Sequence, residues 1–482
     1  MVTPTRSTRW LALATVLLAT FMAQFDLYVV NVALPVLQRQ LHAEHSALQL
    51  IVGGYAFVYA AGLITAGRLG DRFGHRTVFL IGMAAFGLAS LWCGLAQTGS
   101  GLVEARLVQG LAASVMVPQV LALISRLFTP AGRPRALSAF GVVIGIGAVA
   151  GQVVGGLLLH ADLFGLHWRP IFLVNVPIAL IGVVAGALLL PRHETTTHPR
   201  FDVLGAISLP VGLALLLVPL TLGQDAGWPW WTSVAIVAGA LVVAAVLMWE
   251  RRLSIRGGEP VLDPRLFRQA AFANGMGLSA VIFASFFSFV FTLSLLFQDG
   301  IGLSPLDAGL AFAPLSIAFA VASILARGFI ARYGARVIVL GTALACLGLL
   351  AIVIILAADR HPTTPLLIVP MVIVGLGNGT AVPVLTGVVL QGVKSGAGMV
   401  SGILTTAQQF ATAAGIAILG AVFFTALGTS RDLGGYTGAM LFSTTGSLIL
   451  AGLAVLISVR LVNAAKPGSP APHITGSTAA RR

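Results

Sequence analysis

Apolar stretches of about 20 residues recur along this chain, and short polar or charged segments separate them. A helix needs a stretch of that length to cross the hydrocarbon core of a bilayer. The pattern predicts fourteen spanning helices. They are expected near residues 10–32, 48–67, 78–98, 102–124, 136–159, 171–190, 203–222, 232–249, 272–297, 305–326, 337–357, 366–390, 399–426 and 438–462.

The composition supports an all-α polytopic membrane protein. Of the 482 residues, 57% are hydrophobic and 9% are charged, whereas soluble domains carry about 25% charged residues. Both cysteines, Cys93 and Cys346, lie in apolar runs, so a disulfide framework is not expected. The chain contains no GxxxxGK[ST], HExxH, CxxC or GxSxG motif, so we expect neither an enzyme nor a cofactor.

Basic residues predict the orientation of the helices. If the N-terminus is cytoplasmic, most of the 28 Lys and Arg residues fall in cytoplasmic segments, as the positive-inside rule requires. An even number of helices then places both termini in the cytoplasm. We expect a multi-pass protein of the bacterial cytoplasmic (inner) membrane. The net charge of +13 faces anionic lipid, and a nucleic-acid partner is not needed to explain it.

An internal repeat indicates two related halves. GRLGDRFGHR (67–76) aligns with RGFIARYGAR (327–336), and GLAASVMVP (110–118) aligns with GLGNGTAVP (375–383). Two matches in the same order favour a duplication, which is common in transporters. The charged residues are not repeated: Asp71 aligns with Ala331, and Arg106 aligns with Met371. This asymmetry favours a coupling role for the N-terminal charges.

The repeat predicts five segments along the chain. We expect a cytoplasmic N-terminus (1–9), an N-terminal six-helix bundle (10–190), an inserted helix pair with a cytoplasmic linker (191–270), a C-terminal six-helix bundle (271–462) and a disordered cytoplasmic tail (463–482).

Four sequence motifs resemble the major facilitator superfamily, and specifically its fourteen-span drug:proton antiporter branch. They are GRLGDRFGHRTVFLIG, FDLYVVNVALP, EARLVQGLAAS and WRPIFLVNVP. Tyr28 replaces a Thr common in the second motif, and Pro170 stands where an aromatic residue is usual. The resemblance implies the superfamily fold with 14 helices arranged 6+2+6, as two pseudo-symmetric six-helix bundles that alternate access to a central site.

The loop of the first motif is expected to act as a conformational latch. Its glycines allow close approach of helix ends and a tight turn, and Asp71 can face the positive end of a helix or pair with an arginine. The alternative is that Arg72 and Arg76 only anchor the topology. The predicted latch residues are Gly67, Gly70, Asp71, Arg72, Gly74 and Arg76.

Asp26 is the one acid placed deep within a predicted span. A charge there costs about 2.5–3.5 kcal/mol on insertion scales. Burial disfavours the charged form of a carboxyl and a nearby cation favours it, so Asp26 can cycle a proton as access alternates. The family implies that Arg106 influences this carboxylate. The alternatives are a structural hydrogen bond for Asp26 and interfacial snorkelling for Arg106.

Helix five carries a glycine seam with a departure from the family pattern. Its small residues allow two helices to pack backbone to backbone. The antiporter motif has a proline where this chain has glutamine, which keeps its backbone N–H and can hydrogen-bond across the interface. The residues are Gly147, Gly151, Gln152, Gly155 and Gly156.

Aromatic and polar residues indicate a substrate cavity, although most of them can equally serve as packing residues. The candidates are Tyr28, Asn31, Tyr55, Gln109 and Phe287. Aromatic rings suit flat lipophilic molecules. A single deep acid favours a monovalent cation, whereas a neutral or anionic substrate would make Asp26 purely a proton site.

We therefore expect a monomeric, proton-coupled antiporter that exports lipophilic cationic drugs and uses the proton gradient instead of a cofactor. Three alternatives stay open: a dedicated exporter of one endogenous metabolite, antibiotic or lipid-like product, a nutrient symporter, and a sensor or assembly protein. Its partners would be the substrates, protons and the lipid bilayer.

Overall fold

The computed structural model describes residues 6–129, 132–191, 203–223, 226–256, 266–391 and 397–464, and these contain helices and no strand. The first half comprises α1 (Arg6–Leu41), α2 (His45–Gln49), η1 (Leu50–Gly54), α3 (Tyr55–Phe73), α4 (His75–Leu95), α5 (Gly99–Leu127), α6 (Arg133–Ala161), η2 (Leu163–Gly165), α7 (Pro170–Leu173), α8 (Asn175–Leu189), α9 (Val203–Leu222) and α10 (Trp230–Ile255).

The second half comprises η3 (Leu266–Arg268), α11 (Ala270–Leu295), η4 (Leu296–Gly300), α12 (Pro305–Tyr333), α13 (Arg336–Ala358), α14 (Thr364–Gln391), α15 (Ala397–Leu427) and α16 (Leu433–Ala464). Among the described residues, thirteen helices are long and apolar enough to cross a membrane, and the shorter apolar helix Ile207–Leu222 adds a fourteenth. The predicted all-α polytopic architecture is confirmed.

Several helices extend beyond their predicted spans, α1 and α10 among them. α1 continues through Pro35 to Leu41, because membrane helices tolerate an internal proline whose freed carbonyl finds other partners. α10 continues to Ile255, so Glu250 lies inside the helix and is buried instead of lying in a connection. Glu and Arg are good helix formers, and Gly257 is the first strong helix breaker after them.

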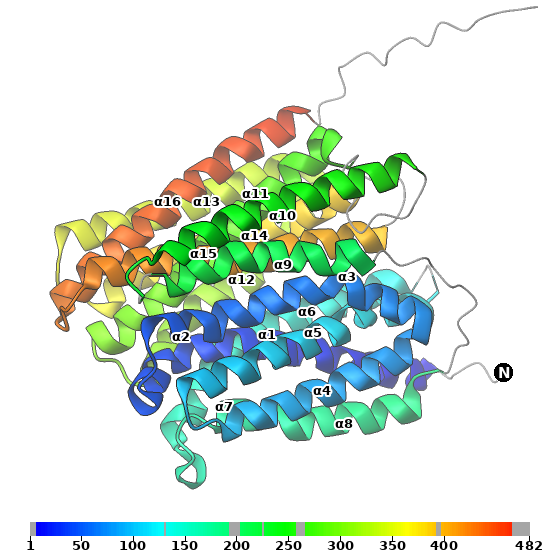
Figure 1. The fold of residues 1–482 in the computed structure, drawn as a ribbon, viewed down its shortest axis with the longest axis horizontal. Helices are drawn as coiled ribbons and strands as arrows, with labels where there is room; N and C mark the ends of the chain where they lie inside the picture. The colour runs from blue at the N-terminus through cyan, green and yellow to red at the C-terminus, as the bar shows by residue number, and fades with distance from the viewer. Residues whose placement is uncertain are drawn as a thin grey trace, which may run out of the picture.

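The helices form two groups that lie side by side (Figure 1). α1 to α8 make one group, and α11 to α16 make the other. α9 lies along the line where they meet, since Leu217 of α9 packs in one cluster with Ala56 of α3 and Ala413 of α15. The predicted inserted pair therefore packs, through α9, on both groups.

Aligned residues of the repeat occupy corresponding places in both halves. The α3–α4 connection turns at Gly74, with φ of 88°, and the α12–α13 connection turns at Gly334, with φ of 58°. Such values favour glycine, which lacks a Cβ. Pro118 lies inside α5 and the aligned Pro383 lies inside α14. These matches support the duplication that the sequence predicts.

The two groups are hydrogen-bonded to each other at the end farther from the termini. Gln298 of η4 donates from Nε2 to the Val32 carbonyl of α1 over 2.7 Å, and Ser294 donates to the Asn31 carbonyl. Beyond them, Arg39 pairs with Asp299 at 2.8 Å. We call this set the α1–α11 closure.

The glycines predicted in helix five bring α6 into close contact with its neighbours. A Cβ on Gly151 would lie 2.7 Å from the Phe25 carbonyl oxygen of α1, and one on Gly156 would lie 2.6 Å from the Pro305 oxygen of α12. A Cβ on Gly147 or Gly155 would also meet α1. α6 thus packs backbone to backbone with one helix from each group, as small residues in membrane helices permit.

We predict that Gly151→Ala destabilises the protein, because its Cβ would meet backbone that cannot move aside cheaply. Overpacking of this kind costs about 1–3 kcal/mol. Gly145→Ala is the matched control, since its Cβ would lie 3.6 Å from the Ala320 Cβ, an ordinary contact. Thermal unfolding of the detergent-solubilised variants, followed by tryptophan fluorescence, measures the difference. Equal unfolding temperatures for the two variants would contradict the prediction.

Candidate functional site

Asp26 lies at the centre of the first helix group and is fully buried. Its carboxylate forms an ion pair with Nη1 of Arg106 from α5. Gln109, one turn further along α5, donates from Nε2 to Asp26 Oδ1 over 2.8 Å. Asn175 of α8 donates to the same oxygen over 3.4 Å. The structure thus brings Asp26 and Arg106 together, as the family resemblance implies, and their role in proton coupling stays a prediction.

The guanidinium of Arg106 has further partners on neighbouring helices. Its Nε donates to the Ile51 carbonyl over 2.9 Å, and Ile51 lies in the π-helical turn η1. Its Cζ lies 4.1 Å from the ring centroid of Tyr55 and 5.7 Å from that of Phe172. Such cation–π contacts stabilise a desolvated cation by about 2 kcal/mol or more. Both charges are thus surrounded by protein groups that replace water.

This arrangement can accommodate protonation of Asp26, because Arg106 keeps a hydrogen bond within the site. Arginine stays charged in proteins, so Asp26 is the group of the pair that can be protonated. If Asp26 is neutralised, Arg106 still has Gln109 Oε1 as an acceptor, 2.6 Å from Nη1. Because Asp26 has no exposed surface, a proton can reach it only when the surrounding helices move.

The sequence reasoning missed three side chains of this site. Asn175 contacts Asp26 directly, while Ser90 accepts a hydrogen bond from Gln109 Nε2 over 2.7 Å. Cys93 donates to Gln109 Oε1 over 3.4 Å. The sequence did carry a signal for Asn175, because it is a polar residue in an apolar stretch of the WRPIFLVNVP motif. Ser90 and Cys93 have no comparable signal, since small residues of this kind occur throughout membrane helices.

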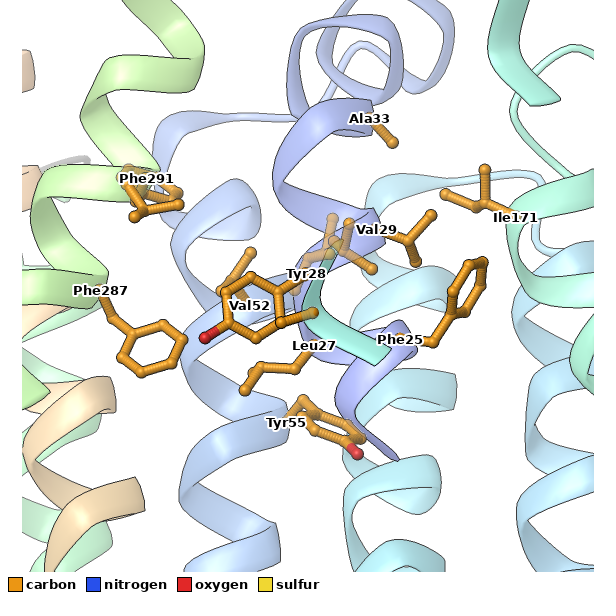
Figure 2. Close-up of a cluster of buried hydrophobic side chains, with 14 of the residues drawn as sticks. Phe25, Leu27, Tyr28, Val29, Ala33, Val52, Tyr55, Ile171, Phe287 and Phe291 are labelled. Carbon is orange, nitrogen blue, oxygen red and sulfur yellow. The ribbon is translucent and has the colours of Figure 1, made fainter. Parts of the chain in front are cut away.

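Of the five predicted cavity residues, two meet at the interface of the helix groups. The rings of Tyr28 and Phe287 lie 5.7 Å apart between α1 and α11, and Figure 2 shows them facing each other. Gln109 and Tyr55 instead belong to the Asp26 site. The side chain of Asn31 donates to the Leu27 carbonyl over 3.0 Å within α1.

The predicted latch surrounds a polar pair that the sequence did not reveal. His75 Nδ1 lies 2.7 Å from Gln119 Oε1 of α5, and Gln119 Nε2 donates to the Ala66 carbonyl over 2.8 Å. A Cβ on Gly70 would collide with both side chains, which explains the need for glycine there. A Cβ on Gly67 would meet nothing within 4 Å.

The charged latch residues have different surroundings. Arg76 donates from Nη2 to the Ala187 carbonyl of α8 over 2.6 Å. Arg72 is exposed and lies over the ring of Phe73 at 5.4 Å. The side chain of Asp71 lies outside the described part of the structure, and its predicted contact stays a prediction.

Gln152 lies fully buried where α6 crosses α12. Its Oε1 accepts a hydrogen bond from Ser316 Oγ of α12. The residue that departs from the family pattern therefore links the two helix groups. Among the described residues, no group of three His, Cys, Asp or Glu side chains could hold a metal ion.

Comparison with known proteins gives consistent matches. The sequence profile of the Major Facilitator Superfamily matches residues 16–203 and 202–416. The probable actinorhodin transporter of Streptomyces coelicolor is 36% identical over 429 residues, covering 88% of this chain and 74% of that protein. Multidrug resistance protein Stp of Mycobacterium tuberculosis is 31% identical over 418 residues, covering 86% of this chain and 76% of that protein.

A solved structure shares the fold. It is a bacterial homologue of the human lysosomal transporter Spinster, in an inward-facing and unoccupied conformation. The TM-score is 0.67 at 13% identity, and the match covers 96% of this chain and 98% of that chain.

We predict that Arg106→Met destabilises the protein more than the double change Asp26→Asn with Arg106→Met. Removing one partner of a buried ion pair costs about 3–5 kcal/mol, because the other charge stays buried and unpaired. Methionine is a suitable replacement, since Met371 occupies the aligned position in α14 and is fully buried there. Thermal unfolding of both variants and the wild type tests this coupling. A double variant no more stable than Arg106→Met would contradict it.

Proposed function

The chain belongs to the Major Facilitator Superfamily, and from this premise we propose that it exports lipophilic small molecules in exchange for protons. The family membership confirms the prediction from the four motifs. The protein is a multi-pass membrane transporter and not an enzyme. Proton coupling, substrate class and orientation in the membrane are the proposed parts.

The buried ion pair of Asp26 and Arg106 is the observation that carries the proposal. A carboxylate at this depth is costly, and the chain supplies it with an arginine and two amide side chains. A purely structural ion pair could stay charged and would need no change in its surroundings. Asp26 lies on α1, the same helix that forms the α1–α11 closure. Opening of that closure can therefore alter the environment of Asp26 and allow a proton to bind or leave.

Alternating access supplies the mechanism. With the predicted orientation, the α1–α11 closure lies on the outer side, and the substrate enters from the cytoplasm. Rocking of the two helix groups then opens the outer side, where release of the substrate is coupled to protonation of Asp26. The return to the closed state delivers the proton to the cytoplasm. Each group moves largely as a rigid body, and one polypeptide suffices, so we propose a monomer with the N-terminal and C-terminal bundles as its moving parts.

The named relatives support export as the direction of transport. One is described as a multidrug resistance protein and another as a probable transporter of actinorhodin. The second name favours an alternative candidate function, the dedicated export of one endogenous antibiotic or related product. The same Asp26 site would serve either candidate, so only the range of transported compounds separates them.

We predict that Asp26→Asn abolishes gradient-driven transport. Asparagine keeps the shape of the side chain but cannot carry a proton. Ethidium or Nile red is added outside proteoliposomes that have an acidic interior, and dye uptake is followed by fluorescence. Wild-type protein should accumulate at least one of these dyes, while the variant should match empty liposomes.

Glu104→Gln is the matched control for this experiment. It makes the same acid-to-amide change on α5, two residues from Arg106, at an exposed position. We expect gradient-driven uptake close to that of the wild type. Full gradient-driven uptake by Asp26→Asn would show that the proposed proton site is wrong.

We predict that Asp71→Ala slows transport without weakening the binding of the dye, because a latch affects the conformational cycle and not the site. Transport is measured in the same proteoliposomes, and binding is measured by fluorescence titration of purified protein. An unchanged transport rate would exclude the latch role.

A further inference from the structure

Asp26 and the interface between the helix groups lie on different faces of α1. Successive residues of a helix are rotated by about 100°, so a rotation of about 200° separates Asp26 from Tyr28 and the two point to nearly opposite sides. Asp26 contacts Arg106, Gln109 and Asn175 within its own helix group. Tyr28 points toward α11 of the other group (Figure 2). A substrate between the groups therefore meets Tyr28 and not the carboxylate.

The Tyr28 side of α1 faces a connected set of aromatic rings, which we call the aromatic array. Phe287 lies 5.7 Å from Tyr28, 5.8 Å from Phe283 and 5.4 Å from Phe286, measured between ring centroids. Phe286 lies 6.3 Å from Phe319 of α12. Phe283 and Phe319 are partly exposed, whereas Tyr28 and Phe287 are buried. The array thus includes both buried and partly exposed rings.

A buried amide adjoins this array. Gln152 accepts from Ser316, which lies one turn from Phe319 on α12. The preceding residue, Gly151, packs so closely on α1 that a Cβ there would lie 2.9 Å from the Tyr28 Cβ. The Nε2 of Gln152 is buried and has no hydrogen-bond partner among the described residues. It is therefore a donor available to an oxygen of a bound molecule.

No acid complements a cation at the array. Within the described part of the chain, the acids other than Asp26 lie near helix ends, in connections or, for the buried Glu250, on α10. Asp299 is already paired with Arg39. A cation entering the interface would leave water without gaining a carboxylate partner, which is unfavourable. An uncharged molecule would bury its rings against Phe283, Phe287 and Phe319 at no such cost.

We propose that the aromatic array and Gln152 form a substrate site for flat, uncharged aromatic molecules that carry a hydrogen-bond acceptor such as a ring carbonyl. The inference rests on the proposed export function and names its substrate class. It replaces the expectation of cationic drugs, which followed from treating Asp26 as a group that the substrate could reach. Asp26 then carries the proton alone.

Two dyes with one ring system test the proposal. Nile red is uncharged and has a ring carbonyl, whereas Nile blue carries a cationic iminium group in its place. Binding to purified protein in detergent is measured by fluorescence titration. We expect Nile red to bind at least about tenfold more tightly than Nile blue, and we expect Asp26→Asn to keep this preference for the uncharged dye.

Two substitutions locate the site. Gln152→Leu should weaken Nile red binding about 2- to 10-fold, the effect of one lost hydrogen bond. Gln298→Leu is its control, because it removes another hydrogen bond between the helix groups, away from the array. Phe319→Leu should also weaken binding, whereas Phe329→Leu, at an exposed position on the same helix, should not.

Tighter binding of Nile blue that is lost in Asp26→Asn would overturn the proposal, because the substrate would then reach the carboxylate. Equal effects of Gln152→Leu and Gln298→Leu on binding would also overturn it, since the amide would then act only by joining the helix groups. These outcomes concern binding alone. Failure of the proposed proton coupling would instead appear as retained gradient-driven uptake by Asp26→Asn.

Discussion

The buried ion pair between Asp26 and Arg106 constrains the whole first helix group. Two opposite charges without access to water need hydrogen-bond partners, and these come from α5, α8 and the π-helical turn η1. Ser90 of α4 in turn accepts a hydrogen bond from Gln109. The π-helical turn includes the carbonyl that Arg106 Nε contacts, a common use of such turns at functional sites. The second group carries no equivalent of Arg106, because Met371 stands at the position that the repeat aligns with it.

In the proposed mechanism the two groups move against each other, and their contacts are suited to that task. The glycines of α6 allow tight packing on α1 and α12, and hydrogen bonds to the Asn31 and Val32 carbonyls close one end of the interface. α1 takes part in both regions, because Asp26 faces the core of its own group and Tyr28 faces α11. In the proposed mechanism, α1 is therefore the element through which a change at the proton site reaches the substrate site.

Sequence reasoning found the main members of the site but could not complete it. Asp26 and Arg106 were recognisable because a charge in an apolar stretch is costly and therefore rare. Asn175 and Gln119 carried a weaker form of the same signal. Ser90, Cys93 and the Ile51 carbonyl could not be predicted, because backbone groups and small residues contribute only through the way neighbouring helices pack. Gln109 was placed in the cavity, since its position along α5 does not reveal which face of the helix meets α1.

The sequence by itself determined the membrane class, the fourteen helices and the duplication, because spanning length, hydropathy and repeated turns are local properties of the chain. It also identified the costly carboxylate. Only the tertiary structure decided which groups surround that carboxylate, and that Tyr28, two residues away, faces the other helix group. The physical reason is that helix rotation and packing depend on contacts between segments far apart in the sequence, and these contacts separate the buried charge from the aromatic interface.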